Sequence, residues 1–101
     1  YLGIQYTSIT ADLQKKYNLP VSKGDYIYST SGESVQTGGP ADKAGIKSKD
    51  IITKVNGYEV GDGTSVSTLV SEYQPGDTVR VTVLRGGKTM NFNVALGTYK
   101  S

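Results

Sequence analysis

The residues of this chain best suited to chemistry are the first four, Tyr1-Leu2-Gly3-Ile4. A glycine among large apolar residues, followed at once by an alternating run over residues 5–9, predicts a loop that leads into a strand. Gly3 allows the backbone to turn its N–H groups outward, and a cluster of free N–H groups binds an anion without a charged side chain. The strand behind this loop would offer an edge to an incoming peptide.

Two residue types that carry much of enzyme chemistry are missing. The chain has no cysteine and no histidine. Thiol nucleophiles, disulfides and zinc sites built on Cys or His are therefore excluded, and a Ser-His-Asp triad has no general base. We expect no catalytic residue in this chain, no metal site and no cofactor.

Size and composition indicate one globular domain. A chain of 101 residues can form one hydrophobic core, and 13 glycines indicate many turns. The net charge of +2 is too small to argue for nucleic acid or an anionic membrane as partner, and the eight tyrosines have no basic stripe among them. The apolar runs are too short to enter a bilayer, so we expect no direct membrane insertion of this segment.

The first half of the chain predicts one short helix and a series of strands. Thr10 is the expected N-cap of a helix that runs to Tyr17, with Leu13 and Tyr17 on one face. A glycine-rich loop over residues 31–40 is expected to be the most mobile part, and residues 40–45 form a single helical turn. Strands are expected at residues 25–30, 51–55 and 58–60, the last two joined by a tight turn at Asn56-Gly57.

The second half predicts a helix and a hairpin. A helix capped by Thr64 or Ser65 runs through Tyr73, because apolar residues recur with helical spacing. Residues 79–83 and 90–96 then alternate apolar and polar around a turn at residues 85–88, with seven apolar side chains on one face. Antiparallel strands with segregated helices make an α+β domain, a partly open barrel, over residues 1–97. Residues 98–101 are expected to form a flexible tail.

At this point four motifs resemble one family. They are Pro40-Ala41 with Ala44-Gly45-Ile46, Asp50-Ile51-Ile52 with Val55-Asn56-Gly57, Pro75-Gly76-Asp77 with Val79, and Leu84-Arg85 with Gly87-Lys88. In order and spacing they are similar to bacterial PDZ domains, above all the C-terminal PDZ domain of HtrA-type (Deg) serine proteases. The resemblance implies a PDZ-like, partly open antiparallel β-barrel or sandwich of five to six strands with two helices, in the circularly permuted strand order of HtrA-type domains.

The resemblance also implies a function. It is capture of the free C-terminus, with a hydrophobic last residue, of substrate or misfolded proteins by β-strand addition. The domain would regulate a serine protease and select its substrates. A protease domain carrying the triad would lie upstream, the full-length protein could oligomerise through it, and the location would be extracytoplasmic. A basic residue before the loop would help to hold the ligand carboxylate.

The expected site has three parts. Tyr1, Leu2, Gly3 and Ile4 form the carboxylate-binding loop, and Gln5, Tyr6 and Thr7 form the strand that pairs with the peptide. Ile4 and Tyr6 point the same way and could form the floor of an apolar pocket. The resemblance adds a groove helix with Ser67, Val70 and Ser71. That helix has no histidine to select a Ser or Thr two residues before the ligand's end, so a hydrophobic last residue should dominate, with affinity about micromolar.

Plainer interpretations stand beside these. Tyr6 is as well explained as a core residue, and Val66, Leu69 and Tyr73 are mainly core. Asp50 resembles a structural turn residue, and Gly86-Gly87-Lys88 lacks the spacing of a phosphate loop.

The sequence departs from the family pattern at Lys49, where glycine is usual, and at Gly39, where serine is usual; the loop before Pro40 is also longer than usual. Alternative functions are a scaffold or docking domain that takes internal segments or a neighbouring chain's tail, such as Tyr99-Lys100-Ser101, and, disfavoured, an enzyme in its own right.

Overall fold

The fold is one antiparallel sheet with three short helices. The computed structural model describes residues 1–30 and 32–97, and within them six strands form a single sheet. Its main path runs β1-β2-β3-β5-β6, and β4 pairs with β3. The predicted tail, residues 98–101, lies outside the described residues. The elements are β1 (Tyr6–Ser8), α1 (Ala11–Tyr17), β2 (Asp25–Ile27), α2 (Pro40–Ala44), β3 (Ile51–Val55), β4 (Tyr58–Glu59), α3 (Val66–Val70), β5 (Thr78–Arg85) and β6 (Lys88–Ala95).

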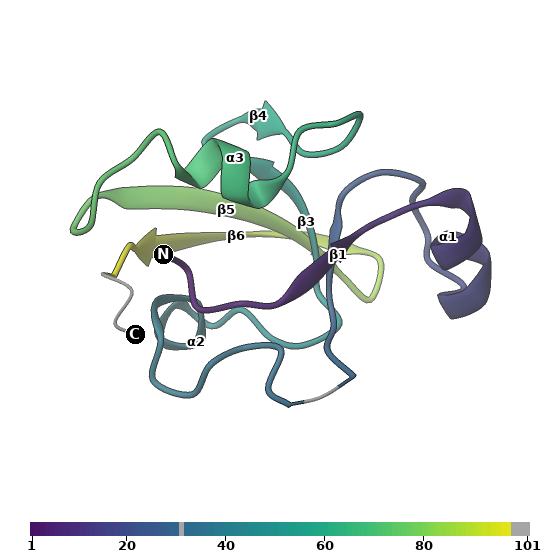
Figure 1. The fold of residues 1–101 in the computed structure, drawn as a ribbon, viewed down its shortest axis with the longest axis horizontal. Helices are drawn as coiled ribbons and strands as arrows, with labels where there is room; N and C mark the ends of the chain where they lie inside the picture. The colour runs from purple at the N-terminus through teal and green to yellow at the C-terminus, as the bar shows by residue number, and fades with distance from the viewer. Residues whose placement is uncertain (31, 98–101) are drawn as a thin grey trace.

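The long β5–β6 hairpin is the centre of the domain, with α3 and α2 on opposite sides of it in the view of Figure 1, and α1 standing apart at one end. The core lies between the sheet and the helices. It is made of aliphatic residues whose side chains are almost completely buried, among them Ile27, Ile46, Ile52, Val55, Val66, Val81 and Val83. The helix pair expected from the resemblance is present, and the predicted single turn at residues 40–45 forms the third helix.

The β5–β6 hairpin confirms the alternating pattern. Its strands pair from Thr78 with Ala95 to Arg85 with Lys88, so only Gly86 and Gly87 form the turn. Both glycines have positive φ, 57° and 82°, as a two-residue turn of this type requires. All seven predicted apolar side chains join the core, five of them buried and Met90 and Phe92 partly so.

Two predicted elements are shorter in the structure. β2 ends at Ile27 instead of residue 30, because the first strand changes its partner there: Gln5 accepts from the Tyr28 N–H but donates to Ser34. α3 ends at Val70 instead of Tyr73. Its last residues bond three positions back, Tyr73 N–H to the Val70 carbonyl among them, which tightens the chain into turns.

The first helix, α1, follows the prediction at both ends. Thr10 caps it by accepting from the Leu13 N–H at 3.2 Å, and Asn18 ends it in the left-handed conformation. Its last residue, Tyr17, packs on Tyr26 and Tyr28, with ring centroids 5.5 and 5.1 Å away. This aromatic cluster attaches the helix to β2.

The backbone conformation at Lys49 explains why glycine is usual at this position in the family. Its φ is +74°, a conformation that a side chain disfavours and glycine adopts freely. Its N–H bonds to the Ile27 carbonyl at 2.8 Å, so the strained turn is tied to β2. The residue after it is then directed into the protein.

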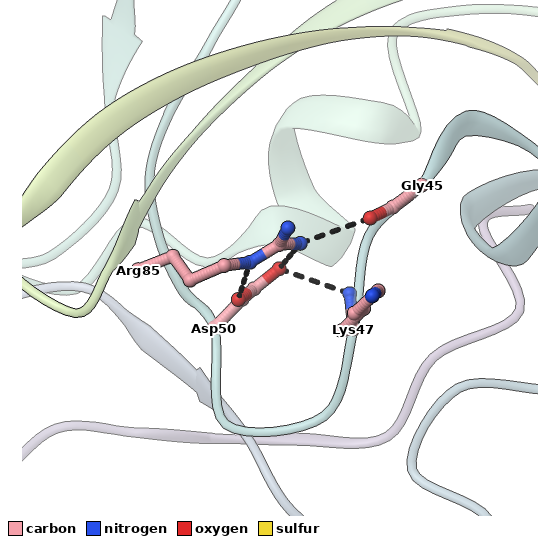
Figure 2. Close-up of polar contacts among 4 residues, drawn as sticks. All are labelled: Gly45, Lys47, Asp50 and Arg85. Atoms are coloured by element: carbon pink, nitrogen blue, oxygen red, sulfur yellow. Dashed lines mark hydrogen bonds and ion pairs between the residues drawn. The ribbon is translucent and has the colours of Figure 1, made fainter.

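That residue, Asp50, forms the buried ion pair of the fold. Its carboxylate accepts from Arg85 Nε at 2.8 Å and Nη2 at 2.6 Å, and from the Lys47 N–H at 2.9 Å, while Arg85 also donates to the Gly45 carbonyl (Figure 2). The Asp50 side chain is 2% exposed and that of Arg85 30%. The pair therefore joins the end of α2 and the start of β3 to the hairpin, and the structural interpretation of Asp50 is confirmed.

Replacing Arg85 with alanine should lower the free energy of unfolding by roughly 3 kcal/mol, because it leaves a buried carboxylate without its cation. Urea unfolding of Arg85→Ala measures this loss. Lys88→Ala, which removes an exposed charge from the first residue of β6, is the matched control and should change stability by less than about 0.5 kcal/mol. Equal effects of the two variants would contradict the role given to the ion pair.

Candidate functional site

A groove lies between the N-terminal loop and α3. Its volume is about 340 Å³. The loop and β1 supply one wall and α3 with the turn after it supplies the other. The lining residues are Tyr1, Leu2, Gly3, Ile4, Tyr6, Val66, Ser67, Val70, Ser71 and Tyr73.

One end of this groove carries free backbone donors. In the described residues, the N–H groups of Leu2, Gly3 and Ile4 donate no hydrogen bond. Their loop is nevertheless held, because the Leu2 carbonyl accepts from Ala41 and the Gly3 carbonyl accepts from Gln36, at 2.9 and 2.8 Å. Gly3 has φ +76°, which lets the peptide planes on both sides of it turn this way. Such a group of N–H donors can hold an anion.

The edge of the first strand is open on one side only. The Gln5 carbonyl accepts from Tyr28 and the Ile9 N–H donates to Gly24, so the odd-numbered residues direct their backbone groups toward β2. Backbone groups alternate in direction along a strand, so those of Ile4, Tyr6 and Ser8 point away from β2. These three residues form the free edge, which runs on directly from the free N–H groups of the loop.

The groove wall α3 is fixed to the sheet through its N-terminal N–H groups. The first three N–H groups of a helix have no partner within it. Here the Val66 N–H donates to the Asp25 carboxylate at 2.9 Å, the Ser67 N–H to the Tyr6 hydroxyl at 3.2 Å, and Thr68 to the N-cap Ser65 at 3.2 Å. Two of the three acceptors lie on β1 and β2. The position of α3 therefore depends on the strands opposite it.

Asp25 is a buried acid in this arrangement. The residue is 1% exposed, and its carboxylate also accepts from the Ser8 hydroxyl at 2.9 Å. Burial raises the pKa of Asp25 above its ordinary value, and the hydrogen bonds from Val66 and Ser8 offset part of that rise. The folded domain therefore binds a proton at Asp25 more readily than the unfolded chain does.

The structure brings together most of the expected site. Tyr1, Leu2, Gly3, Ile4 and Tyr6 line the groove opposite Ser67, Val70 and Ser71. Gln5 and Thr7 do not line it; their side chains are exposed and their backbone groups face the other way. The peptide-pairing role expected of residues 5–7 thus rests on the backbone of Tyr6 and its even-numbered neighbours.

Sequence reasoning placed two lining residues mainly in the core. Val66 is both a core residue and part of the groove, and Tyr73, in the turn after α3, packs partly buried against the core and also lines the groove. Because Val66 and Tyr73 belong to the same helical spacing, the sequence could have suggested that both line the groove. Leu69 lies on the other flank of α3, beside a second cavity of about 310 Å³ that it shares with Tyr58 and Glu72. The support that Asp25 gives to α3 has no signal in the sequence.

The described part of the chain holds no cluster of three or more acidic residues that could bind a metal ion. In residues 1–30 and 32–97 there is also no helix with the length and apolarity needed to cross a membrane. The chemistry that the groove offers is a set of backbone donors, a free strand edge and, between them, a cavity lined by no charged side chain.

This combination of fold and groove defines the class of protein. The family model for the PDZ domain matches residues 1–96, and the chain belongs to this family. The relatives and solved structures that it matches include periplasmic serine endoproteases and HtrA-type proteases, the group that the motifs indicated.

Two curated relatives illustrate this. The chain is 34% identical over its full length to a probable periplasmic serine endoprotease DegP-like of Rhizobium meliloti, and 34% identical over 99% of its length to the periplasmic pH-dependent serine endoprotease DegQ of Escherichia coli. It covers 19% and 21% of these relatives, so it spans about a fifth of their length.

Solved structures agree on the fold. The HtrA-type protease AlgW with a decapeptide matches all of this chain and 30% of that chain, with a TM-score of 0.82 and 25% identity. The HtrA3 PDZ domain bound to the phage-derived ligand FGRWV matches 94% of this chain and 82% of that one, with a TM-score of 0.74 and 29% identity. The predicted fold class is confirmed.

The raised pKa of Asp25 predicts a pH dependence of stability. An acid whose pKa is higher in the folded state stabilises that state most below its unfolded pKa, and this contribution is lost as the pH rises through the folded pKa. The Asp25→Asn variant keeps an acceptor for Val66 but cannot titrate. Compared with this variant, the wild type should therefore gain stability as the pH falls through the range between the folded and the unfolded pKa of Asp25.

Urea unfolding of both proteins between about pH 7 and pH 3.5 measures that difference. Asp12→Asn, on the exposed first turn of α1, is the matched control, because it makes the same substitution at a carboxylate that is not buried. A difference between wild type and Asp25→Asn that is constant with pH would contradict the role of burial.

Proposed function

We propose that this domain binds the free C-terminus of a protein or peptide by adding it as a strand to β1. The observation that carries the proposal is the continuity of free N–H groups at Leu2, Gly3 and Ile4 with the open edge at Ile4, Tyr6 and Ser8. A carboxylate needs clustered donors, and an extended chain needs a free edge. In this groove both lie in line, on the same segment.

The direction of the ligand follows from these positions. With its carboxylate on the loop, the last residue lies opposite Ile4, and the chain runs antiparallel to β1 toward Ser8. The last side chain then enters the cavity beside Ile4 and Val70, which are partly and almost fully buried. That cavity contains no charged residue, so it favours a hydrophobic last residue.

The setting of this activity is also a proposal. We infer that the domain recognises substrates or misfolded proteins for an HtrA-type serine protease, outside the cytoplasm. Support comes from the relatives, which are periplasmic serine endoproteases, and from the neighbouring HtrA-type structures that hold peptides. No triad can form within this chain, because it has no histidine. The proteolytic residues would belong to another domain.

Titration with two peptides tests the carboxylate site. A hexapeptide with a free, hydrophobic C-terminus should bind with a Kd of about 1–100 μM, and its C-terminally amidated twin should bind at least about tenfold more weakly, because charge-assisted hydrogen bonds are lost. Isothermal titration calorimetry measures both. Equal affinity of the two peptides would contradict carboxylate capture and favour a groove that takes internal segments.

Amide hydrogen exchange tests strand addition separately. The N–H groups of Ile4 and Tyr6 should exchange quickly in the free domain and slowly with the peptide bound, because an added strand would accept from Tyr6 and the carboxylate from Ile4. The Gln5 N–H already donates to Ser34 at 2.8 Å, so it should be protected in both states and is the internal control. Unchanged exchange at Tyr6 with saturating peptide would exclude pairing with this edge.

A further inference from the structure

The groove is crossed at one point by a pair of side chains. The Tyr6 hydroxyl lies 2.5 Å from Ser67 Oγ and accepts from the Ser67 N–H at 3.2 Å. Tyr6 comes from the strand wall and Ser67 from the helix wall, and both line the groove. Two hydrogen bonds to one hydroxyl fix the ring in place. We name Tyr6 and Ser67 together the crossbar.

The crossbar lies at a definite distance from the anion-binding end. Ile4 and Tyr6 are the first two residues with free edge groups, and they are two positions apart. A ligand strand whose last residue lies opposite Ile4 therefore has its third-from-last residue opposite Tyr6. This step rests on the proposed function, because it assumes that the ligand's end is held by the loop.

The side chain of that ligand residue would meet the crossbar. Side chains directly opposite each other in antiparallel strands lie on the same face, with Cβ atoms about 4.5–5.5 Å apart. The Tyr6 side chain is on the groove face, since its hydroxyl reaches α3. The third-from-last side chain of the ligand is thus directed at space already occupied by the Tyr6 ring and Ser67.

Removing the crossbar has a structural cost that keeps it in place. The Ser67 N–H is one of the three N-terminal donors of α3, and Tyr6 is its acceptor. A large ligand side chain at this position would have to turn the ring away and break both hydrogen bonds to the Tyr6 hydroxyl. A small side chain would leave both hydrogen bonds intact.

We propose that Tyr6, held by Ser67, is a specificity-determining residue that restricts the third-from-last position of the ligand to small side chains such as glycine, alanine and serine. The other parts of the groove place no comparable obstacle, because the last residue faces an open cavity. The absence of histidine from α3 left this position without a selecting group; the crossbar supplies one through steric exclusion.

The test compares two hexapeptides with free C-termini, identical except for alanine or phenylalanine at the third-from-last position. Wild type should bind the alanine peptide about tenfold more tightly, which corresponds to about 1.4 kcal/mol. In Tyr6→Phe, which keeps the ring but loses its attachment, the ratio should fall below about threefold through improved binding of the phenylalanine peptide. Tyr58→Phe, which removes a tyrosine hydroxyl from the exposed strand β4, should keep the wild-type ratio.

A second variant changes the crossbar from the α3 side, so that the test does not depend on Tyr6→Phe alone. Ser67→Ala removes the side-chain half of the crossbar while the N–H of residue 67 remains, so the ratio should fall in the same direction but less. Equal binding of both peptides by wild type would overturn this inference and leave C-terminal capture standing. Binding of neither peptide would overturn both. A wild-type ratio that persists in Tyr6→Phe and Ser67→Ala would show that other residues select this position.

Discussion

The structure depends on the division of backbone hydrogen bonds along residues 3–9. Every second residue of this segment is used on one side, by β2 or by residues 34–36, and the alternate residues remain unused on the other side. A strand that was paired on both sides would have no binding capacity, and one paired on neither side would not be ordered. The half-paired state requires that the sheet continue through β2 and β3 to the long hairpin. The ion pair of Asp50 with Arg85 ties that hairpin to the turn before β3.

The second wall of the groove is placed by side chains rather than by packing alone. α3 has only five residues, too few to be stable in isolation. Asp25 and Tyr6 satisfy its free N–H groups from the strands opposite, while Val66 and Val70 bury its apolar face. Within residues 1–30 and 32–97, the partners of the buried Asp25 carboxylate are neutral groups and not cations. Its charge is stabilised by the Val66 N–H and the Ser8 hydroxyl, at the point where a helix N-terminus favours an anion.

The sequence was sufficient for the elements that have strong local signals. The alternating valines of β5, the glycine turn at Gly86 and Gly87 and the Thr10 cap were all predicted and found. The loop of Tyr1 to Ile4 and the positions of Ser67, Val70 and Ser71 could be placed in one groove because the family motifs fix the order of the strands.

The parts that the sequence could not give are the contacts between distant segments. The bond from Val66 to Asp25 joins residues 41 positions apart, and that from Tyr6 to Ser67 joins residues 61 apart. No periodicity reports such pairs. The ends of β2 and α3 were misplaced for a related reason, since a change of hydrogen-bond partner, and not residue propensity, ends both elements.

The pairing of Ile4 with Val35 has a consequence for affinity. Ser34 and Gln36 bond to Gln5 and Gly3 from outside the groove, so residues 34–36 support the back of the loop proposed to bind the carboxylate. Donors that are already oriented need not lose conformational entropy when a ligand arrives. The strength of the proposed carboxylate binding would then depend partly on a segment that does not touch the ligand. Homologous domains could thus change affinity through the length of this segment while their ligand-contacting residues stay the same.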